Sequence, residues 1–469
     1  MRMEPSLLNA DSPFVALHHE VVNWLQARRQ STVFDDSHLQ VMFSQCKNLV
    51  ERLQKRGAVV GSSLNTAYLL ERLSQTLERL ETLMAIFVSN RYLPRRILLL
   101  TGCFARAAAE KHSITRLWKQ SSRLISRSIT QNAGDHGEHY ITRDKKEFWA
   151  MFYSAAGGGV LIALMALFKI YLGSIIDDKV WKGVAEGLNY GLGFMVIFML
   201  HFTVATKQPA MTAARFAEAV EKTPQGKSVN MKLAQLLVDV FRSQSIAVLG
   251  NVLIAMGLAA LIAFGYQYKT GEPLMNADQI AYQLHSIDPF AGTLWFAAIA
   301  GVWLFCSGII SGYFDNRSNY LNMRMRLTQH PLLKKLMSEK SRVKFANYMH
   351  ENYGSLIGNL CFGMLLGITG VVGYLTHLPL DIRHVAFSSA NVGYIAVSGQ
   401  FTYSLLLQCI GFVLLIGLVN LIVSFSLTLW VALRSLNAEI ESWWPIWHEV
   451  CQIVKKRPLS LFLPVQLDK

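Results

Sequence analysis

Six long apolar stretches, separated by short polar loops, constrain the fold of this chain more than any other feature. A helix that crosses a bilayer needs ~20 mostly apolar residues, because each residue rises ~1.5 Å through ~30 Å of hydrocarbon. Six stretches meet this requirement without an Asp, Glu, Lys or Arg near their centres: residues 148–168, 188–206, 246–264, 290–313, 356–376 and 401–433. The sequence therefore predicts an all-α polytopic integral membrane protein with six transmembrane helices.

The composition supports this prediction and argues against a soluble protein. Only 16% of the residues are charged, 52% are hydrophobic, and the mean hydropathy is +0.28. A soluble domain usually carries about 25% charged residues. The six cysteines are scattered without a CxxC pair, so we expect neither a disulfide framework nor a zinc site. We expect no cofactor and no metal.

The loops between the predicted spans alternate in their content of Lys and Arg. In chain order the five loops hold two, six, one, eight and one such residues, with Lys169 counted at the end of the first span, and the tail after residue 433 holds five. The positive-inside rule places the basic loops in the cytoplasm. We therefore expect a multi-pass protein of the bacterial inner membrane with both termini in the cytoplasm.

Three regions follow from this topology. We expect a basic, helical cytoplasmic domain over residues 1–147, a membrane domain over residues 148–433, and a cytoplasmic tail over residues 434–469. In the first region, apolar residues recur at helical spacing after Ser37, up to Gly57. They recur again over residues 63–88, as in an antiparallel hairpin. A third helix is predicted from Pro94 to about Thr130.

The third predicted helix carries a basic stripe on one face, formed by Arg116, Lys119, Arg123 and Arg127. Such a stripe is typical of a solvated helix face, of a surface that binds anionic lipid headgroups, or of a nucleic-acid site. Its position just before the first span favours lipid over nucleic acid, because basic juxtamembrane segments are attracted to the inner leaflet. We therefore expect membrane lipids as partners and no nucleic acid.

A candidate polar site lies where the second predicted span leaves the membrane. Pro209 interrupts helical hydrogen bonding there and can free backbone carbonyls. The polar side chains are Thr203, Thr206, Lys207, Gln208 and Thr212. Within the spans themselves the sequence places His201, Asn251, Asn359 and Asn420. An ionisable His at such a depth suggests function, and the amides suggest interhelical hydrogen bonds.

The loop between the fifth and sixth spans supplies a second part of the candidate site. It contains Asp381, Arg383, His384, Ser388, Ser389 and Asn391. Residues 385–400 are too polar for a confident span and too apolar for a free loop. Either a re-entrant segment that lines a cavity or a helix on the outer leaflet fits this pattern.

Four strings resemble a bacterial multi-pass membrane family named "site-specific recombinase", of the Gcr type. They are GEHYITRD from Gly137, HFTVATKQPAMT from His201, GYFDNR from Gly312, and PLDIRHVAFSSAN from Pro379. Members of this family are generally longer at the N-terminus, so we expect this chain to be a short version. The family name implies a role in DNA recombination.

The residues themselves do not predict that chemistry. A tyrosine recombinase usually contains His-x-x-Arg, and none of the thirteen histidines has an Arg three positions later. No serine lies among clustered arginines near the N-terminus, as a serine recombinase requires. We therefore expect a non-enzymatic protein, either transporter-like or channel-like with a small-molecule or lipid ligand, or a membrane organiser. A homo-oligomer is compatible with both, and site-specific recombination is the alternative.

Overall fold

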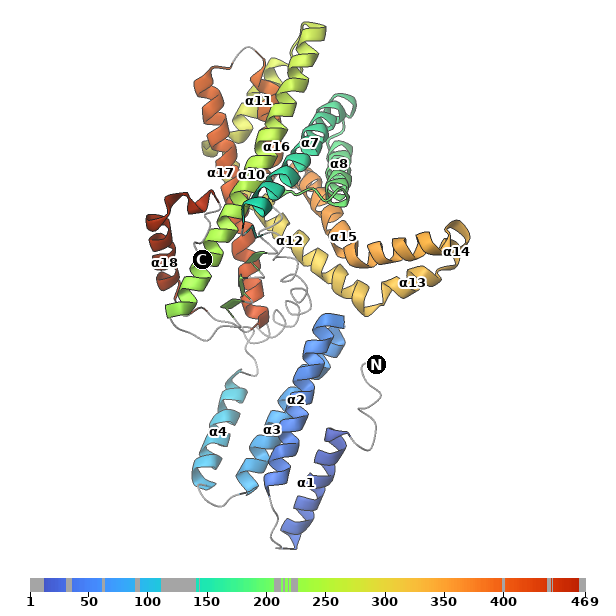
Figure 1. Ribbon diagram of the computed structural model, residues 1–469, viewed down its shortest axis with the longest axis vertical. Coiled ribbons are helices and arrows are strands. Elements are labelled where there is room, and N and C mark those ends of the chain that lie inside the picture. The colour runs from blue at the N-terminus through green and yellow to red at the C-terminus, as the bar shows by residue number, and fades with distance from the viewer. Residues whose placement is uncertain are drawn as a thin grey trace. The chain divides into compact units, whose positions relative to one another are not determined.

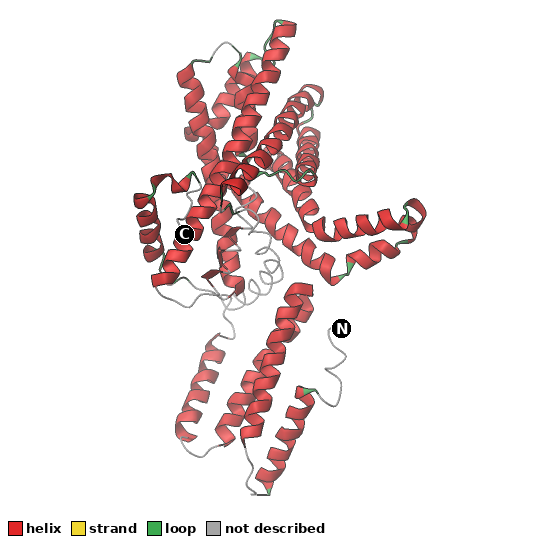
Figure 2. Cartoon of the chain, in the orientation of Figure 1, coloured by secondary structure: helices red, strands yellow, loops and turns green. Residues whose placement is uncertain are grey.

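A computed structural model of the chain describes residues 12–463 apart from several gaps. The gaps are residues 31–35, 61–63, 89–92, 111–140, 143, 206–211, 214–215, 218, 221–226, 399–400, 437–439 and 441. The chain divides into two compact units, residues 1–128 with 319–321 and the remainder. Every regular element among the described residues is a helix (Figures 1 and 2).

The first unit contains four described helices: α1 (Pro13–Arg29), α2 (Asp36–Val60), α3 (Leu64–Val88) and α4 (Leu93–Glu110). The predicted hairpin is confirmed, since α2 buries Leu39, Phe43, Cys46 and Val50 together with Leu77 of α3. One detail was wrong, because α2 continues past Gly57 to Val60. A further helix that the sequence pattern did not reveal, α1, adds Leu17 to the same buried cluster.

The second unit contains the membrane helices. By length and composition, five helices are able to cross a membrane: α7 (Lys145–Ile175), α10 (Lys227–Thr270), α12 (Thr293–Tyr320), α15 (Glu339–Thr376) and α17 (Tyr403–Leu436). They contain five of the six predicted spans. Shorter helices connect or cover them: α11 (Ala277–Ile287), α13 (Met323–Gln329), α14 (Pro331–Leu336), α16 (Val385–Ala396) and α18 (Trp444–Lys456). The prediction of an all-α polytopic membrane protein is confirmed.

The remaining predicted span corresponds to α8 (Lys179–Met199). Its 21 residues span about 31 Å at ~1.5 Å per residue, which is long enough to cross the hydrocarbon. It is less apolar than the other five because Lys179, Lys182 and Glu186 lie in its first half. The predicted boundaries of this span, 188 and 206, were therefore both too late.

Helices α8 and α15 pack through glycines on both sides. A Cβ atom added to Gly363 would lie 2.0 Å from the backbone nitrogen of Gly191, and one added to Gly367 would lie 2.3 Å from the Cα of Gly187. Only hydrogen atoms fit in these gaps. The pairs Gly187/Gly191 and Gly363/Gly367, each with GxxxG spacing, therefore face each other, which brings the backbones of the two helices together.

The chain leaves the helical conformation after α8, at the position of the candidate polar site. His201 adopts a left-handed conformation (φ 57°), and residues 202–204 run as irregular backbone against α7 and α10. Asn251 of α10 holds this segment. Its Nδ2 donates to the Thr203 carbonyl (2.9 Å) and to the Ala155 carbonyl of α7 (2.6 Å), and its Oδ1 accepts from the Ala205 amide (2.9 Å). These bonds replace the helical ones that the break removes.

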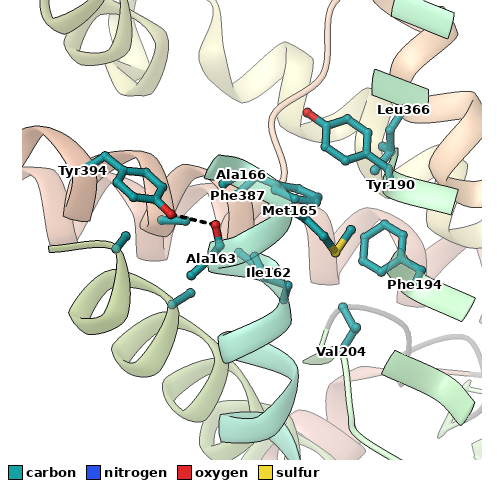
Figure 3. Packing of buried hydrophobic residues seen from close by; sticks show 14 of the residues in the cluster. Ile162, Ala163, Met165, Ala166, Tyr190, Phe194, Val204, Leu366, Phe387 and Tyr394 are labelled. Atoms are coloured by element: carbon teal, nitrogen blue, oxygen red, sulfur yellow. Dashed lines mark hydrogen bonds between the residues drawn. The ribbon is translucent and has the colours of Figure 1, made fainter. Parts of the chain in front are cut away.

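Helix α16 lies in the interior of the second unit. It contacts α7, α10, α11 and α17, and ten of its twelve residues are buried. Gly393 allows this contact, because a Cβ atom there would lie 2.2 Å from the Met256 carbonyl oxygen of α10. The Tyr394 hydroxyl donates to the Ala163 carbonyl of α7 at 2.8 Å (Figure 3). The uncharged stretch after His384 is thus a buried helix that packs against the long helices.

Candidate functional site

A polar cavity of about 500 Å³ lies between the first turns of α8, the last turns of α7, α11, and the segment that leads into α16. Its lining includes three cations, three carboxylates, one histidine and several amides and hydroxyls. The polar members are Lys169, Lys182, Glu186, Tyr190, Asn276, Asp278, Gln279, Tyr282, Gln283, Ser286, Asp381, Arg383, His384, Ser388 and Asn391. We call this the polar cavity. The polar cavity lies at the end of the helix bundle that carries α11.

The segment before α16 is fixed in place by Arg383. The guanidinium donates through Nε to the Ser286 carbonyl at the end of α11 (2.8 Å) and pairs through Nη1 with Asp381 (2.6 Å). It also lies over the ring of Phe296, 5.3 Å from the centroid. Asn420 of α17 anchors the same segment, because its Nδ2 donates to the Arg383 carbonyl and its Oδ1 accepts from the Val385 amide. Arg383 is thereby committed to shaping the wall.

His384 lies where the segment turns into α16. Its ring is among three aromatic rings, those of Phe194, Phe362 and Phe387, at centroid distances between 5.8 and 6.1 Å. Phe194 and Phe362 are fully buried. Figure 3 shows Phe387 of α16 close to Tyr190 and Phe194 of α8. The three phenylalanines therefore form an aromatic cluster around His384, and one of them, Phe387, lines the polar cavity.

Helices α7 and α8 form a second wall. The Lys169 ammonium of α7 pairs with the Glu186 carboxylate of α8 at 3.2 Å and lies 5.6 Å from the centroid of the Tyr190 ring. Lys182 lies one turn before Glu186, and its Nζ passes over Gly173. A Cβ atom added to Gly173 would lie 3.1 Å from this Nζ. Because Gly173 has no side chain, the Lys182 ammonium can reach the cavity.

Helix α11 forms the facing wall. It begins with a capping box in which Asn276 and Gln279 satisfy each other's backbone amides, and Asp278 lies in its first turn. A carboxylate is favoured there by the helix dipole. One turn later, Gln283 accepts a hydrogen bond from the Asn391 side chain of α16 at 3.0 Å. This bond joins α11 to α16 across the cavity.

Five of the six candidate residues from the loop between the fifth and sixth predicted spans line the polar cavity: Asp381, Arg383, His384, Ser388 and Asn391. The sixth, Ser389, does not. It is fully buried, and its hydroxyl donates to the Ala386 carbonyl of its own helix at 2.7 Å. Neighbouring helix positions point about 100° apart, so Ser388 and Ser389 face different surroundings.

The candidate residues after α8 do not join this cavity among the described residues. Thr203 is buried, and its hydroxyl contacts Ser154 of α7 at 2.9 Å. Thr212 is fully buried beside the cluster that contains Phe216. Thr206, Lys207 and Gln208 lie outside the described residues, as do the four basic residues Arg116, Lys119, Arg123 and Arg127.

The four polar residues that the sequence placed within the predicted spans serve different roles. Asn251 and Asn420 each bond between helices, as described above, whereas Asn359 donates to the Ser355 carbonyl of its own helix at 2.7 Å. His201 is exposed at the break after α8, and its carbonyl accepts from Ser154.

The sequence did not identify the α7–α8 wall or α11. Lys169, Lys182 and Glu186 lie at the edges of predicted spans, where charged residues are ordinarily read as loop residues. Glu186 offered one signal, because it is followed by Gly187 and Gly191, whose spacing predicts close helix packing and hence a position inside the bundle. No local pattern indicated that Asp278 would line the cavity or that Gln283 would bond to α16.

The comparisons with known proteins identify the family. The sequence profile of a family described as site-specific recombinase matches residues 1–464. Neither the curated proteins nor the solved structures contain a significant match to this chain. Because the profile covers almost the whole chain, the chain belongs to the site-specific recombinase family.

Proposed function

We propose that this protein is a membrane-embedded binding protein of the carrier type, which takes a small zwitterionic solute into the polar cavity. The observation that carries the proposal is a cavity of about 500 Å³ that is lined by charges of both signs among membrane helices. Ligand pockets typically measure ~300–1,000 Å³. Charged side chains within membrane segments are costly, and they mark substrate pathways more often than packing.

The charges of the polar cavity indicate the kind of ligand. Four of the six are paired within the walls, as Lys169 with Glu186 and Arg383 with Asp381. Lys182 on α8 and Asp278 on α11 form no ion pair with any described residue. One is a cation and the other an anion, and they belong to facing walls. A solute with an anionic group toward Lys182 and a cationic group toward Asp278 satisfies both.

The architecture around the cavity supports a carrier. Carriers place their sites where broken or irregular segments meet between membrane helices. Here the irregular residues 377–384 lead to the short buried helix α16, and an aromatic cluster surrounds His384 in the cavity wall. We infer that this cluster closes the cavity on its side, which is the arrangement that alternating access requires.

We also infer the orientation and the membrane. Following the distribution of Lys and Arg among the loops, the α11 end faces away from the cytoplasm and both termini face into it, in a bacterial inner membrane. The solute then enters from the non-cytoplasmic side.

Site-specific recombination is the second candidate, and the match to a family with that name favours it. Strand exchange needs a nucleophile among cationic groups that stabilise the transferred phosphate. In the polar cavity the two partnered cations are neutralised by carboxylates, which disfavours phosphate binding there. Incubation of the purified protein with a supercoiled plasmid that carries paired candidate sites separates the two functions, because cleaved or rejoined DNA contradicts the carrier proposal.

Ligand binding is tested by thermal unfolding of the purified, detergent-solubilised protein. The probes are straight-chain ω-amino acids of increasing length, each matched with the carboxylate and the amine of the same chain length. A probe at ~100 times its Kd stabilises the folded state by about 2.7 kcal/mol. We expect stabilisation by the zwitterions and little by the singly charged analogues.

Charge reversal makes the test specific to the two residues. Lys182→Glu should shift the preference to diamines, Asp278→Lys should shift it to dicarboxylates, and the double exchange should restore the zwitterions. A purely structural role of Asp278 at the start of α11 predicts lower stability in the variant without a change in ligand preference. Equal stabilisation by neutral, singly charged and zwitterionic probes would contradict the zwitterion assignment.

A further inference from the structure

A second feature, independent of the polar cavity, lies between α12 and α15. Residues 323–344 form α13, α14 and the first residues of α15, and we call them the basic arm. In Figure 1 the arm extends to the right, crosswise to the long helices α10 and α17. If those helices cross the membrane, an arm in this direction runs along the membrane surface.

The basic arm is strongly cationic. It contains one carboxylate, Glu339, and seven Lys or Arg residues: Arg324, Arg326, Lys334, Lys335, Lys340, Arg342 and Lys344. Six of the seven are among the exposed residues, namely Arg324, Arg326, Lys334, Lys335, Lys340 and Lys344. No ion pair joins any of the seven to a described carboxylate. The arm therefore presents a positive surface to whatever lies beside it.

Apolar side chains are exposed among these charges. Leu332 is 62% and Leu336 79% exposed, and the two lie four residues apart on one face of α14. Met325 of α13 is 46% exposed. A helix of six residues is too short to be stable alone in water. Its shortness and its two exposed leucines together indicate that α14 packs against another surface. Mixed basic and apolar surfaces are typical of segments that lie in the headgroup region of a bilayer.

We propose that the basic arm docks on the leaflet at the α18 end of the bundle, with its lysines and arginines against anionic lipid headgroups and Leu332 and Leu336 in the acyl boundary. Nucleic acid would also be attracted by the charge, but it offers no partner for the leucines. The leucines therefore favour the lipid surface.

The test uses the full chain with its native cysteines replaced, in nanodiscs of phosphatidylcholine with or without phosphatidylglycerol. A polarity-sensitive fluorophore is attached at Leu336→Cys, and at Glu272→Cys in the exposed loop before α11 as the matched control. We expect the Leu336 label to emit at shorter wavelength in the anionic discs and to be quenched by lipids that carry a doxyl group near the headgroup. The control label should remain unquenched in both.

Charge dependence completes the test. At ~1 kcal/mol for each lysine near an anionic surface, replacing Lys334 and Lys335 by Gln should lower the ratio of docked to free arm about 30-fold. Equal quenching in anionic and neutral discs would overturn the electrostatic part of the proposal, and no quenching in anionic discs would overturn docking altogether. Displacement of the label from the anionic discs by duplex DNA would assign the arm to nucleic acid instead.

Discussion

The contact between α8 and α15 provides a sharp prediction, because the structure leaves no room for a side chain there. In Gly367→Ala the new methyl carbon would lie 2.3 Å from both the Cα and the nitrogen of Gly187 and 2.6 Å from the Gly183 carbonyl oxygen. All three neighbours are backbone atoms, so no rotamer change relieves the overlap. An ordinary contact requires about 3.4 Å, and the helices must therefore separate by about 1 Å.

Overpacking of this kind typically costs ~1–3 kcal/mol, which corresponds to a factor of about 5 to 150 in the folding equilibrium. Gly257→Ala on α10 is the matched control. It is also a glycine in a membrane helix, but a Cβ atom there meets nothing within 4 Å. Alanine is the better helix former by ~0.5–1 kcal/mol, so the control should be neutral or slightly more stable.

The assay is unfolding of the purified protein in mixed micelles, with Trp fluorescence as the signal. The chain has 10 tryptophans. We expect a lower unfolding midpoint for Gly367→Ala than for the wild type and an unchanged or higher one for Gly257→Ala. Equal midpoints for the two variants would refute the conclusion that α8 and α15 pack backbone to backbone.

Three further predictions concern single side chains. Asn251→Leu removes three hydrogen bonds around the break after α8. At ~0.6 kcal/mol per bond in a membrane, it should lower the stability by about 2 kcal/mol. The control Ser307→Ala removes one bond within its own helix and should cost less than about 1 kcal/mol in the same unfolding assay. Glu186→Gln leaves Lys169 without its carboxylate partner and should destabilise the fold by about 1–2 kcal/mol. This is less than the cost of breaking a fully buried ion pair, because the Lys169 side chain is 37% exposed. A double variant with Lys169→Met should recover part of the lost stability, and merely additive effects of the two substitutions would argue against the ion pair. Burial raises the pKa of the Cys46 thiol to about 11. At pH 8 Cys46 should therefore react with maleimide about 100-fold more slowly than the exposed Cys451, and its reaction rate should continue to rise with pH up to about 11. The rates are measured by mass spectrometry, and equal rates for the two cysteines would contradict the burial of Cys46.

Much of the fold could be predicted because the bilayer imposes a length on apolar helices. Residues 246–264, for example, lie inside α10, which continues past the predicted span at both ends. The second span was misplaced because hydropathy does not detect a membrane helix whose charged residues are accommodated by neighbouring helices. Lys182 and Glu186 read as loop residues, although they line a cavity within the bundle.

Only part of the lining of the polar cavity could be predicted from the sequence. The segment from Asp381 to Asn391 stood out because its composition suited neither a span nor a free loop, and that anomaly reflects a buried helix beside a polar cavity. Its partners on α7, α8 and α11 could not be predicted from local sequence, since which helices become neighbours depends on packing across long separations. The pairing of Gln283 with Asn391 is a contact of this kind.

Thiol accessibility tests whether the polar cavity receives a solute from the α11 side of the membrane. In the cysteine-free protein, Asn391→Cys places a thiol on the cavity wall, and Ser389→Cys places one two residues away, where the side chain is buried and does not line the cavity. A membrane-impermeant thiol reagent is added to intact cells. We predict rapid labelling of Cys at 391, slowed by a binding ω-amino acid, and little labelling at 389. Equal labelling at both positions, or labelling at 391 only after the cytoplasmic side is exposed, would contradict it.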